Sequence, residues 1–219
     1  MVYLSMDSGI FITDNRLKFS QELANKLRDK GLKVCLSSEY KEDNKESGVT
    51  TEIEWNRSSL FSLQAIPLKL KNINIAADTS ILIFDAPAYS KIYPGTDALS
   101  IDKTISDLVS ANAALSLVLK NYYIKKGQGR LIFVHRDADI PCGNPNISAA
   151  SAAFARIAEE TVDAVRKTEL PGVQTLLVKL EGFEDEVFAD WLCNQIASPV
   201  LSRSPGRWVK AGQRSFFGK

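Results

Sequence analysis

Short β-branched runs alternate with longer segments of helical periodicity along the chain. The first run, at 10–13, predicts a buried strand. The helix predicted after it is carried by five residues at helical spacing: Leu17, Ser20, Leu23, Ala24 and Leu27. Gly31 stands where a helix commonly ends, and 33–36 predicts a second strand. These elements form a βαβ unit, in which a right-handed crossover is nearly obligatory.

The same alternation continues to the end of the chain. The polar segment 37–48 predicts an exposed loop or a frayed helix. Five further strands are predicted, at 51–55, 80–84, 130–134, 174–180 and 206–210. Three further helices are predicted, at 101–123, 148–166 and 184–196. The pattern is typical of a doubly wound α/β fold, with a parallel, Rossmann-like sheet in a single three-layer domain over 1–219 and a basic strand and tail at 203–219.

Composition narrows the classes of protein that remain. A chain of 219 residues with 45% hydrophobic content can bury one substantial core. The 27 basic and 26 acidic residues nearly balance, so no global field favours nucleic acid. The first seven residues lack a basic and apolar signal pattern, and no run approaches the roughly 20 apolar residues that cross a bilayer. We therefore expect a cytoplasmic protein without a membrane partner.

The metal-ligating residue types are few and scattered. Cys35, Cys142 and Cys193 are odd in number and far apart, which favours reduced thiols over a disulfide framework. His135 is the one histidine of the chain. We therefore expect no metal site.

Three stretches, in order and at plausible spacing, resemble the short-chain dehydrogenase/reductase family over essentially the whole chain. Residues 129–134 resemble the strand before the family's catalytic serine, and 146–154 resemble its Tyr-Ser-Ala-Ser-Lys-Ala-Ala helix start. Residues 197–212 resemble its closing strand. The resemblance implies a Rossmann-like fold and, in active members, hydride transfer with NAD or NADP.

The family's nucleotide motifs are altered in this chain. Its Thr-Gly-x-x-x-Gly-x-Gly turn falls on 13–20, and Asp14, Lys18 and Ser20 stand at the three glycine positions. These glycines let the pyrophosphate approach the backbone at a helix N-terminus, whereas a carboxylate at Asp14 repels phosphate. Lys18 is a candidate substitute clamp or a solvated side chain. The family's Asn-Ala-Gly turn falls on 85–87, where a proline removes a donor and remodels the turn.

The catalytic positions are altered as well. At the family's Tyr-x-x-x-Lys pair the chain has Ile147 and Ser151, which supply neither a proton nor a cation. The catalytic serine would map near His135, which is a candidate replacement proton donor or a structural residue. Asn112 is the candidate for the family's helical asparagine. Residues 180–182 lead almost directly into the next helix and leave no room for a substrate lid.

The sequence therefore predicts a non-catalytic member, with no catalytic, cofactor-binding or metal-binding residues and no cofactor. One alternative is a divergent NAD- or NADP-dependent oxidoreductase. Another is a small-ligand binding module that uses the vacated cofactor cleft. The residues expected around that cleft are Asp14, Lys18, Asp85, His135 and Arg136.

Alanine-rich helices suggest how such a protein would act. The small residues are Ala111, Ala113, Ala114, Ala149, Ala150, Ala152, Ala153 and Ala155. They suit either the core or an interface between subunits. By resemblance we expect a homo-oligomer, or a hetero-oligomer in which the chain supports an active dehydrogenase subunit. The tail mixes cations with aromatic residues, and we expect it to pack on a neighbouring subunit rather than on nucleic acid: Arg203, Arg207, Trp208, Lys210, Arg214, Phe216, Phe217 and Lys219.

Overall fold

A computed structural model describes residues 9–39, 52–73, 75, 77–137, 144–201 and 206–212. Within these ranges seven parallel strands form one sheet in the order β3-β2-β1-β4-β5-β6-β7. The strands are β1 (Gly9–Ile12), β2 (Lys33–Glu39), β3 (Glu52–Trp55), β4 (Ala77–Asp85), β5 (Gly129–Arg136), β6 (Val173–Lys179) and β7 (Trp208–Lys210). The strand order reverses between β1 and β4. Ligands of open α/β sheets bind at such a reversal, outside the carboxyl ends of the strands.

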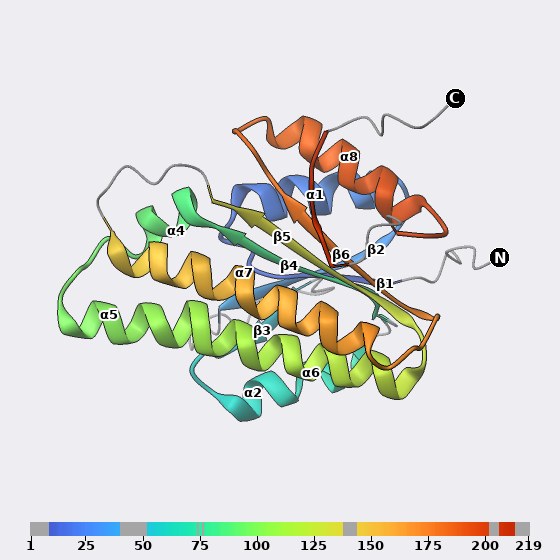
Figure 1. The fold of residues 1–219 in the computed structure, drawn as a ribbon, viewed down its shortest axis with the longest axis horizontal. Coiled ribbons are helices and arrows are strands. Elements are labelled where there is room, and N and C mark those ends of the chain that lie inside the picture. Colours follow the sequence, from blue (N-terminus) through green and yellow to red (C-terminus); the bar gives the residue numbers. More distant parts are fainter. Residues whose placement is uncertain are drawn as a thin grey trace.

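Helices cover both faces of the sheet (Figure 1). On one face α1 (Lys18–Asp29) packs against α8 (Asp185–Ala197). On the other lie α5 (Ala98–Thr104), the π-helical stretch η1 (Ile105–Ser110), α6 (Ala111–Lys126) and α7 (Pro145–Arg166). Three short helices complete the described part: α2 (Leu60–Gln64), α3 (Ile66–Asn72) and α4 (Ala86–Ile92). The predicted doubly wound, three-layer architecture is confirmed.

The core follows from the hydrophobic pattern of the strands and helices. The central strands are apolar on both faces because helices cover each side, as parallel sheets require. On α1 the predicted stripe is buried, with Leu23 and Leu27 fully inaccessible. Each such side chain contributes roughly 1.5–3 kcal/mol by its removal from water. Gly31 follows the end of α1 with φ +80, which a glycine adopts without strain.

Most predicted elements are present with shifted ends, and some predictions were wrong or incomplete. Residues 37–48 were predicted as an exposed loop or a frayed helix. Residues 37–39 instead belong to β2, where they pair with β3, and 40–48 lie outside the described residues. The helix predicted at 101–123 extends from Ala98 to Lys126 and contains the π-helical stretch. Helices α2, α3 and α4 were not predicted, since they are too short to show a helical period.

The alanine residues of α6 and α7 divide between buried and exposed positions. Ala111 and Ala150 are buried where α6 packs on α7, whereas Ala149 and Ala152 face outward. Burial raises the pKa of the Cys35 thiol to about 12. Cys142 and most of the tail lie outside the described residues. Among the described helices none is long and apolar enough to cross a membrane.

Candidate functional site

The turn between β1 and α1 lies at the strand reversal, where the fold places a ligand. It is tied to both neighbouring strands. The Thr13 hydroxyl accepts from the Ile83 amide at 2.8 Å, and the Asp14 amide donates to the Ser37 hydroxyl at 2.8 Å. The Ser20 hydroxyl donates to the Thr13 carbonyl at 2.9 Å. The turn is therefore fixed by side chains of the sheet and of α1.

Asp14 adopts the left-handed backbone conformation, with φ +63. A glycine enters this region freely, whereas other residues need compensation. The Asp14 carboxylate has that compensation, because it pairs with Arg16 at 2.8 Å and with Arg57 at 2.9 Å. It also accepts from the Tyr89 hydroxyl at 2.8 Å. Burial opposes the charged form, but the two guanidinium groups outweigh it and lower the Asp14 pKa to about 2.

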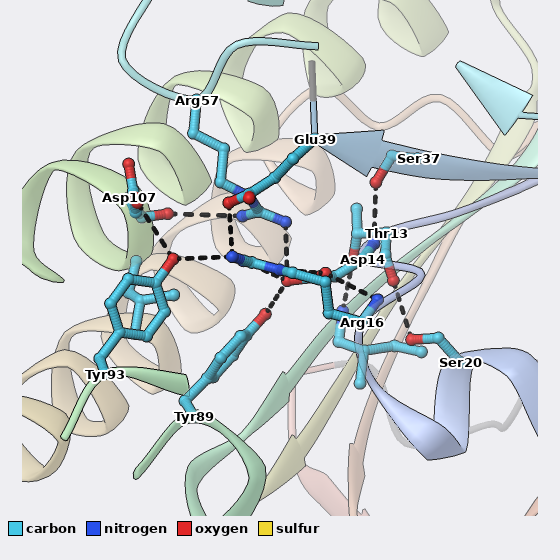
Figure 2. Close-up of polar contacts among 12 residues, drawn as sticks. Thr13, Asp14, Arg16, Ser20, Ser37, Glu39, Arg57, Tyr89, Tyr93 and Asp107 are labelled. Atoms are coloured by element: carbon cyan, nitrogen blue, oxygen red, sulfur yellow. Dashed lines mark hydrogen bonds and ion pairs between the residues drawn. The ribbon is translucent and has the colours of Figure 1, made fainter. Parts of the chain in front are cut away.

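Arg16 spans the reversal of the sheet (Figure 2). Its guanidinium binds Asp14 on the turn, Glu39 at the end of β2 and the Tyr93 hydroxyl just after α4. The groups that follow β1, β2 and β4 are thereby joined by one side chain. Helix α1 begins at Lys18, two residues after Arg16.

Arg57 and two tyrosines complete this group, which we call the Asp14 cluster (Asp14, Arg16, Arg57, Tyr89 and Tyr93). Arg57 follows β3 and lies 4.6 Å from the centre of the Trp55 ring. Tyr93 accepts from Arg16 and donates to the Asp107 carboxylate at 3.0 Å. Burial raises the pKa of Tyr93 to about 12 and that of Tyr89 further. Both hydroxyls therefore stay protonated at neutral pH and act as fixed donors.

A second arginine-centred group closes the carboxyl ends of β4, β5 and β6. Arg136 is the last residue of β5, and its side chain is 4% exposed. Its guanidinium binds Asp85 at 2.7 Å and also binds Asp185 at the start of α8. The rings of Phe19 and Phe183 each lie 5.7 Å from it. Burial raises the pKa of Asp85, and the nearby Arg136 acts in the opposite direction.

His135 is held in a buried polar contact rather than exposed to a reactant. Its Nε2 lies 2.8 Å from the Ser151 hydroxyl, and that hydroxyl donates to Asp137 at 3.0 Å. Because Ser151 gives its proton to the carboxylate, His135 is the donor in the first contact. The rings of Phe84, Phe154 and Trp208 surround the imidazole. Burial lowers the His135 pKa from 6.5 to about 4, so the ring is neutral at physiological pH.

The structure separates the residues that the sequence analysis grouped around one cleft. Asp14 binds Arg57 in the Asp14 cluster, whereas Asp85 binds Arg136 in the second group. Lys18 points to solvent on the first turn of α1. His135 lies with Ser151. The prediction that these five residues surround a common open cleft is therefore wrong, because Asp14, Asp85, His135 and Arg136 are all buried.

Three other positions that the resemblance singled out, Ile147, Ser151 and Asn112, are also buried. Ile147 is fully buried on α7, and Ser151 is 1% exposed beside His135. The Asn112 amide donates to the Leu108 carbonyl at 2.7 Å, one turn earlier in the same helix. The link between β6 and α8 is short, as predicted, since β6 ends at Lys179 and α8 begins at Asp185.

The sequence analysis missed Arg16, Arg57, Tyr89, Tyr93 and Asp107. One local signal was available, because an Asp followed two residues later by Arg is compatible with a side chain that closes its own turn. The Arg16 amide does donate to the Asp14 carboxylate at 3.1 Å. The partners from α4 and η1 are distant in sequence, and no local pattern indicates them.

Among the described residues, no group of His, Cys, Asp and Glu side chains is arranged to hold a metal ion.

Comparison with solved structures defines the class of fold. A short chain dehydrogenase from Bacillus anthracis str. 'Ames Ancestor' superposes with a TM-score of 0.70 at 14% identity, covering 94% of this chain and 95% of that one. A short chain dehydrogenase from Leptospira borgpetersenii serovar Hardjo-bovis (strain JB197), solved with bound NAD+, gives a TM-score of 0.68 at 12% identity, over 96% and 95% of the two chains. The fold is therefore that of the short-chain dehydrogenases.

Sequence comparison identifies a nearer relative. A protein of Treponema pallidum (strain Nichols), described as an uncharacterized protein, is 45% identical over 214 residues, which cover 98% of this chain and 97% of that protein. The chain belongs to the same protein family. No family model matches it.

Proposed function

We propose that this protein is a non-catalytic member of the short-chain dehydrogenase fold, which acts through its surfaces and does not hold a dinucleotide. The observation that carries the proposal is that two arginine-centred groups occupy the carboxyl ends of the strands: the Asp14 cluster lies at the sheet reversal, and the Arg136 group lies at the ends of β4 and β5. These are the positions where the fold would take the two ends of NAD.

The turn after β1 does not fit a pyrophosphate. Such a site offers backbone amides at a helix N-terminus and no negative charge. Here the Asp14 carboxylate is ionised, since its pKa is lowered to about 2. Arg16 would supply a cation, but it is already shared between Asp14 and Glu39. A phosphate would have to break these ion pairs while it stayed close to Asp14.

The opposite end of the crevice does not fit a nicotinamide and its substrate. Arg136 lies between Asp85 and Asp185, with phenylalanine rings on its faces. Removing one partner from such a buried group costs about 3–5 kcal/mol. A ring that displaced the guanidinium would have to offset this cost.

No proton donor of suitable pKa replaces the family's tyrosine at the described positions near α7. Ile147 has no ionisable group, and Ser151 already donates to Asp137. His135 is neutral above about pH 4 and holds its one proton toward Ser151. Efficient general acids have pKa values near the working pH, and none of these groups does.

Self-association through α6 and α7 is the second part of the proposal. Ala149 and Ala152 face outward on α7. In the same helical layer, Ile105 of η1 is 37% exposed and Leu117 of α6 is 51% exposed. Small and apolar side chains on adjacent helices let a second helical pair approach closely. The partner is a second copy of this chain or an active subunit of the same fold.

Calorimetric titration with NADH and NADPH, with the oligomeric mass measured in the same buffer, tests both parts. We expect no binding of either nucleotide at about millimolar concentration, and a mass above that of the monomer. Ala152→Arg should lower the mass, whereas Asn25→Arg on the exposed side of α1 should not. Micromolar nucleotide binding would refute the proposal and favour a divergent oxidoreductase. A monomer at all concentrations would refute the second part alone.

A further inference from the structure

An open cavity of about 430 Å³ lies beside the Asp14 cluster and has Arg57 in common with it. Its wall combines the end of β3 and the loop after it with α5 and η1. The residues that matter below are Trp55, Arg57, Ser58, Ser106 and Asp107. The volume is within the range of small-molecule sites, which are concave and have a few convergent polar groups.

Asp107 is the unusual residue of this wall. It is 5% exposed, yet no Lys, Arg or His nitrogen of the described residues lies within 4.0 Å of its carboxylate. Arg57 is close, but it donates to the Asp107 backbone carbonyl and forms its ion pair with Asp14. A buried carboxylate without a cation is costly, so buried charges are usually paired. Asp107 is therefore poised for a cation that the described residues do not supply.

The hydroxyl groups around Asp107 have spare capacity. Ser58 donates to the Asp107 carboxylate at 3.4 Å, and Ser106 donates to the Ser58 hydroxyl at 3.5 Å. Both contacts are at the long limit of hydrogen bonds and are correspondingly weak. Each hydroxyl can accept a shorter bond from a donor that enters the cavity. Asp107 and Ser106 lie in the π-helical stretch η1, and such stretches are frequent at functional sites.

Two buried donors lie in the same wall. The indole nitrogen of Trp55 and the Nε of Arg57 have no hydrogen-bond partner among the described residues. Trp55 is 1% exposed and Arg57 is 6% exposed. Unsatisfied buried donors are rare and call for an explanation. Both nitrogens can donate to an acceptor, whereas the Asp107 carboxylate can bind a cation.

We propose that this cavity binds a small primary amine that also carries an acceptor group. Its ammonium pairs with Asp107 and donates to Ser58 and Ser106. The acceptor, a hydroxyl or carbonyl oxygen, lies toward Trp55 and Arg57. The three donors of a primary ammonium match the carboxylate and the two hydroxyls. The cavity shares Glu39 and Arg57 with the network around Asp14, but amine binding is measured without nucleotide, so its outcome is distinguishable from that of the titrations with NADH and NADPH.

Matched pairs of ligands test this site. Ethanolamine, putrescine and glucosamine are titrated against ethylene glycol, 1,4-butanediol and glucose, in which a hydroxyl replaces each ammonium. Calorimetry gives the affinity of each ligand. The NMR resonance of the Trp55 indole N–H reports on the cavity wall, and it can be distinguished because the chain has three tryptophans. We expect at least one amine to bind about tenfold or more tightly than its neutral counterpart and to shift the Trp55 resonance.

Variants locate the contact. Asp107→Asn keeps the shape and the acceptor for Tyr93 but removes the charge, and it should weaken amine binding about tenfold or more. Ser106→Ala should weaken it a few-fold and provides a second test if Asp107→Asn proves unstable. Asp102→Asn, on the exposed rim, should change affinity by less than about threefold. The proposal would be overturned if the amines and their neutral counterparts bound equally well. It would also be overturned if Asp107→Asn and Ser106→Ala both bound the amines as tightly as wild type.

Discussion

Replacement of Asp14 by Asn tests whether the Asp14 cluster is held together by charge. Asparagine has the shape of aspartate and tolerates the left-handed conformation that Asp14 adopts. The Arg16 amide donates to Asp14 Oδ1 and the Tyr89 hydroxyl donates to Oδ2, and the single amide oxygen of asparagine can replace only one of these acceptors. The substitution therefore keeps the shape and removes one negative charge and one acceptor.

The expected loss of stability follows from the burial of the partners. The Asp14 side chain is 2% exposed and that of Arg57 is 4% exposed, whereas that of Arg16 is 19% exposed. Leaving a buried charge without its partner costs about 3–5 kcal/mol. The fall of the Asp14 pKa from 3.8 to about 2 corresponds to about 2.4 kcal/mol. We expect Asp14→Asn to lower the free energy of unfolding by about 2–4 kcal/mol at pH 7.

Urea unfolding followed by circular dichroism measures this loss as a shift of the midpoint at constant m. Glu39→Gln is the matched control, because it removes a charge from the exposed end of the same network. The Glu39 side chain is 41% exposed, and such pairs contribute about 0–1 kcal/mol.

The pH dependence gives a second, independent measurement. The Asp14 pKa is lower in the folded state, so its contribution is complete above the unfolded value of 3.8 and is lost as the pH falls toward 2. The difference between wild type and Asp14→Asn should shrink over this range. An Asp14→Asn protein within about 0.5 kcal/mol of wild type at pH 7 would refute the reasoning, because the ion pairs would then contribute nothing net.

Three further predictions concern the same closed crevice. The low His135 pKa predicts that the free energy of unfolding of wild type falls by up to about 3 kcal/mol as the pH falls from 6.5 to 4, because the unfolded chain binds a proton that the folded chain does not. His135→Gln should lack this loss, and parallel pH profiles of the two proteins would contradict the prediction. Asp14→Gly removes the carboxylate from the turn before α1 and breaks its ion pairs with Arg16 and Arg57. It should create pyrophosphate binding that wild type lacks in calorimetry; unchanged heats would count against the assigned role of Asp14. Arg136→Met leaves Asp85 and Asp185 unpaired and should cost about 3 kcal/mol in urea, with Arg136→Lys intermediate; a stable Arg136→Met would show that this pair adds nothing to an apolar replacement.

The fold was predictable because its information is local. Each strand buried on both faces is an uninterrupted apolar run, as in 80–84 and 130–134, and each long helix has a periodic apolar face. The short helices were not predicted, because five to seven residues are too few to show a repeated apolar face. Helix α4 begins with an Asp85 cap and a proline within its first turn, which the sequence analysis took for a remodelled turn.

The site was only half predictable for a related reason. The sequence showed that Asp14 replaces a glycine and repels phosphate, since this needs only the local turn. It did not show that Arg57 lies 2.9 Å from that carboxylate, because the two residues meet through the order of β1, β2 and β3. His135 was predicted with both a catalytic and a structural alternative. The buried contact with Ser151, which favours the structural one, depends on the packing of α7 against β5.

The central claim is that the chain's own arginines occupy the dinucleotide crevice, and a crystal structure grown with saturating NADH tests it most directly. We predict Arg16 on Asp14, Arg136 between Asp85 and Asp185, and no nucleotide density at the carboxyl ends of β1, β4 and β5. A dinucleotide bound there, with either arginine displaced from its carboxylate, would contradict the account.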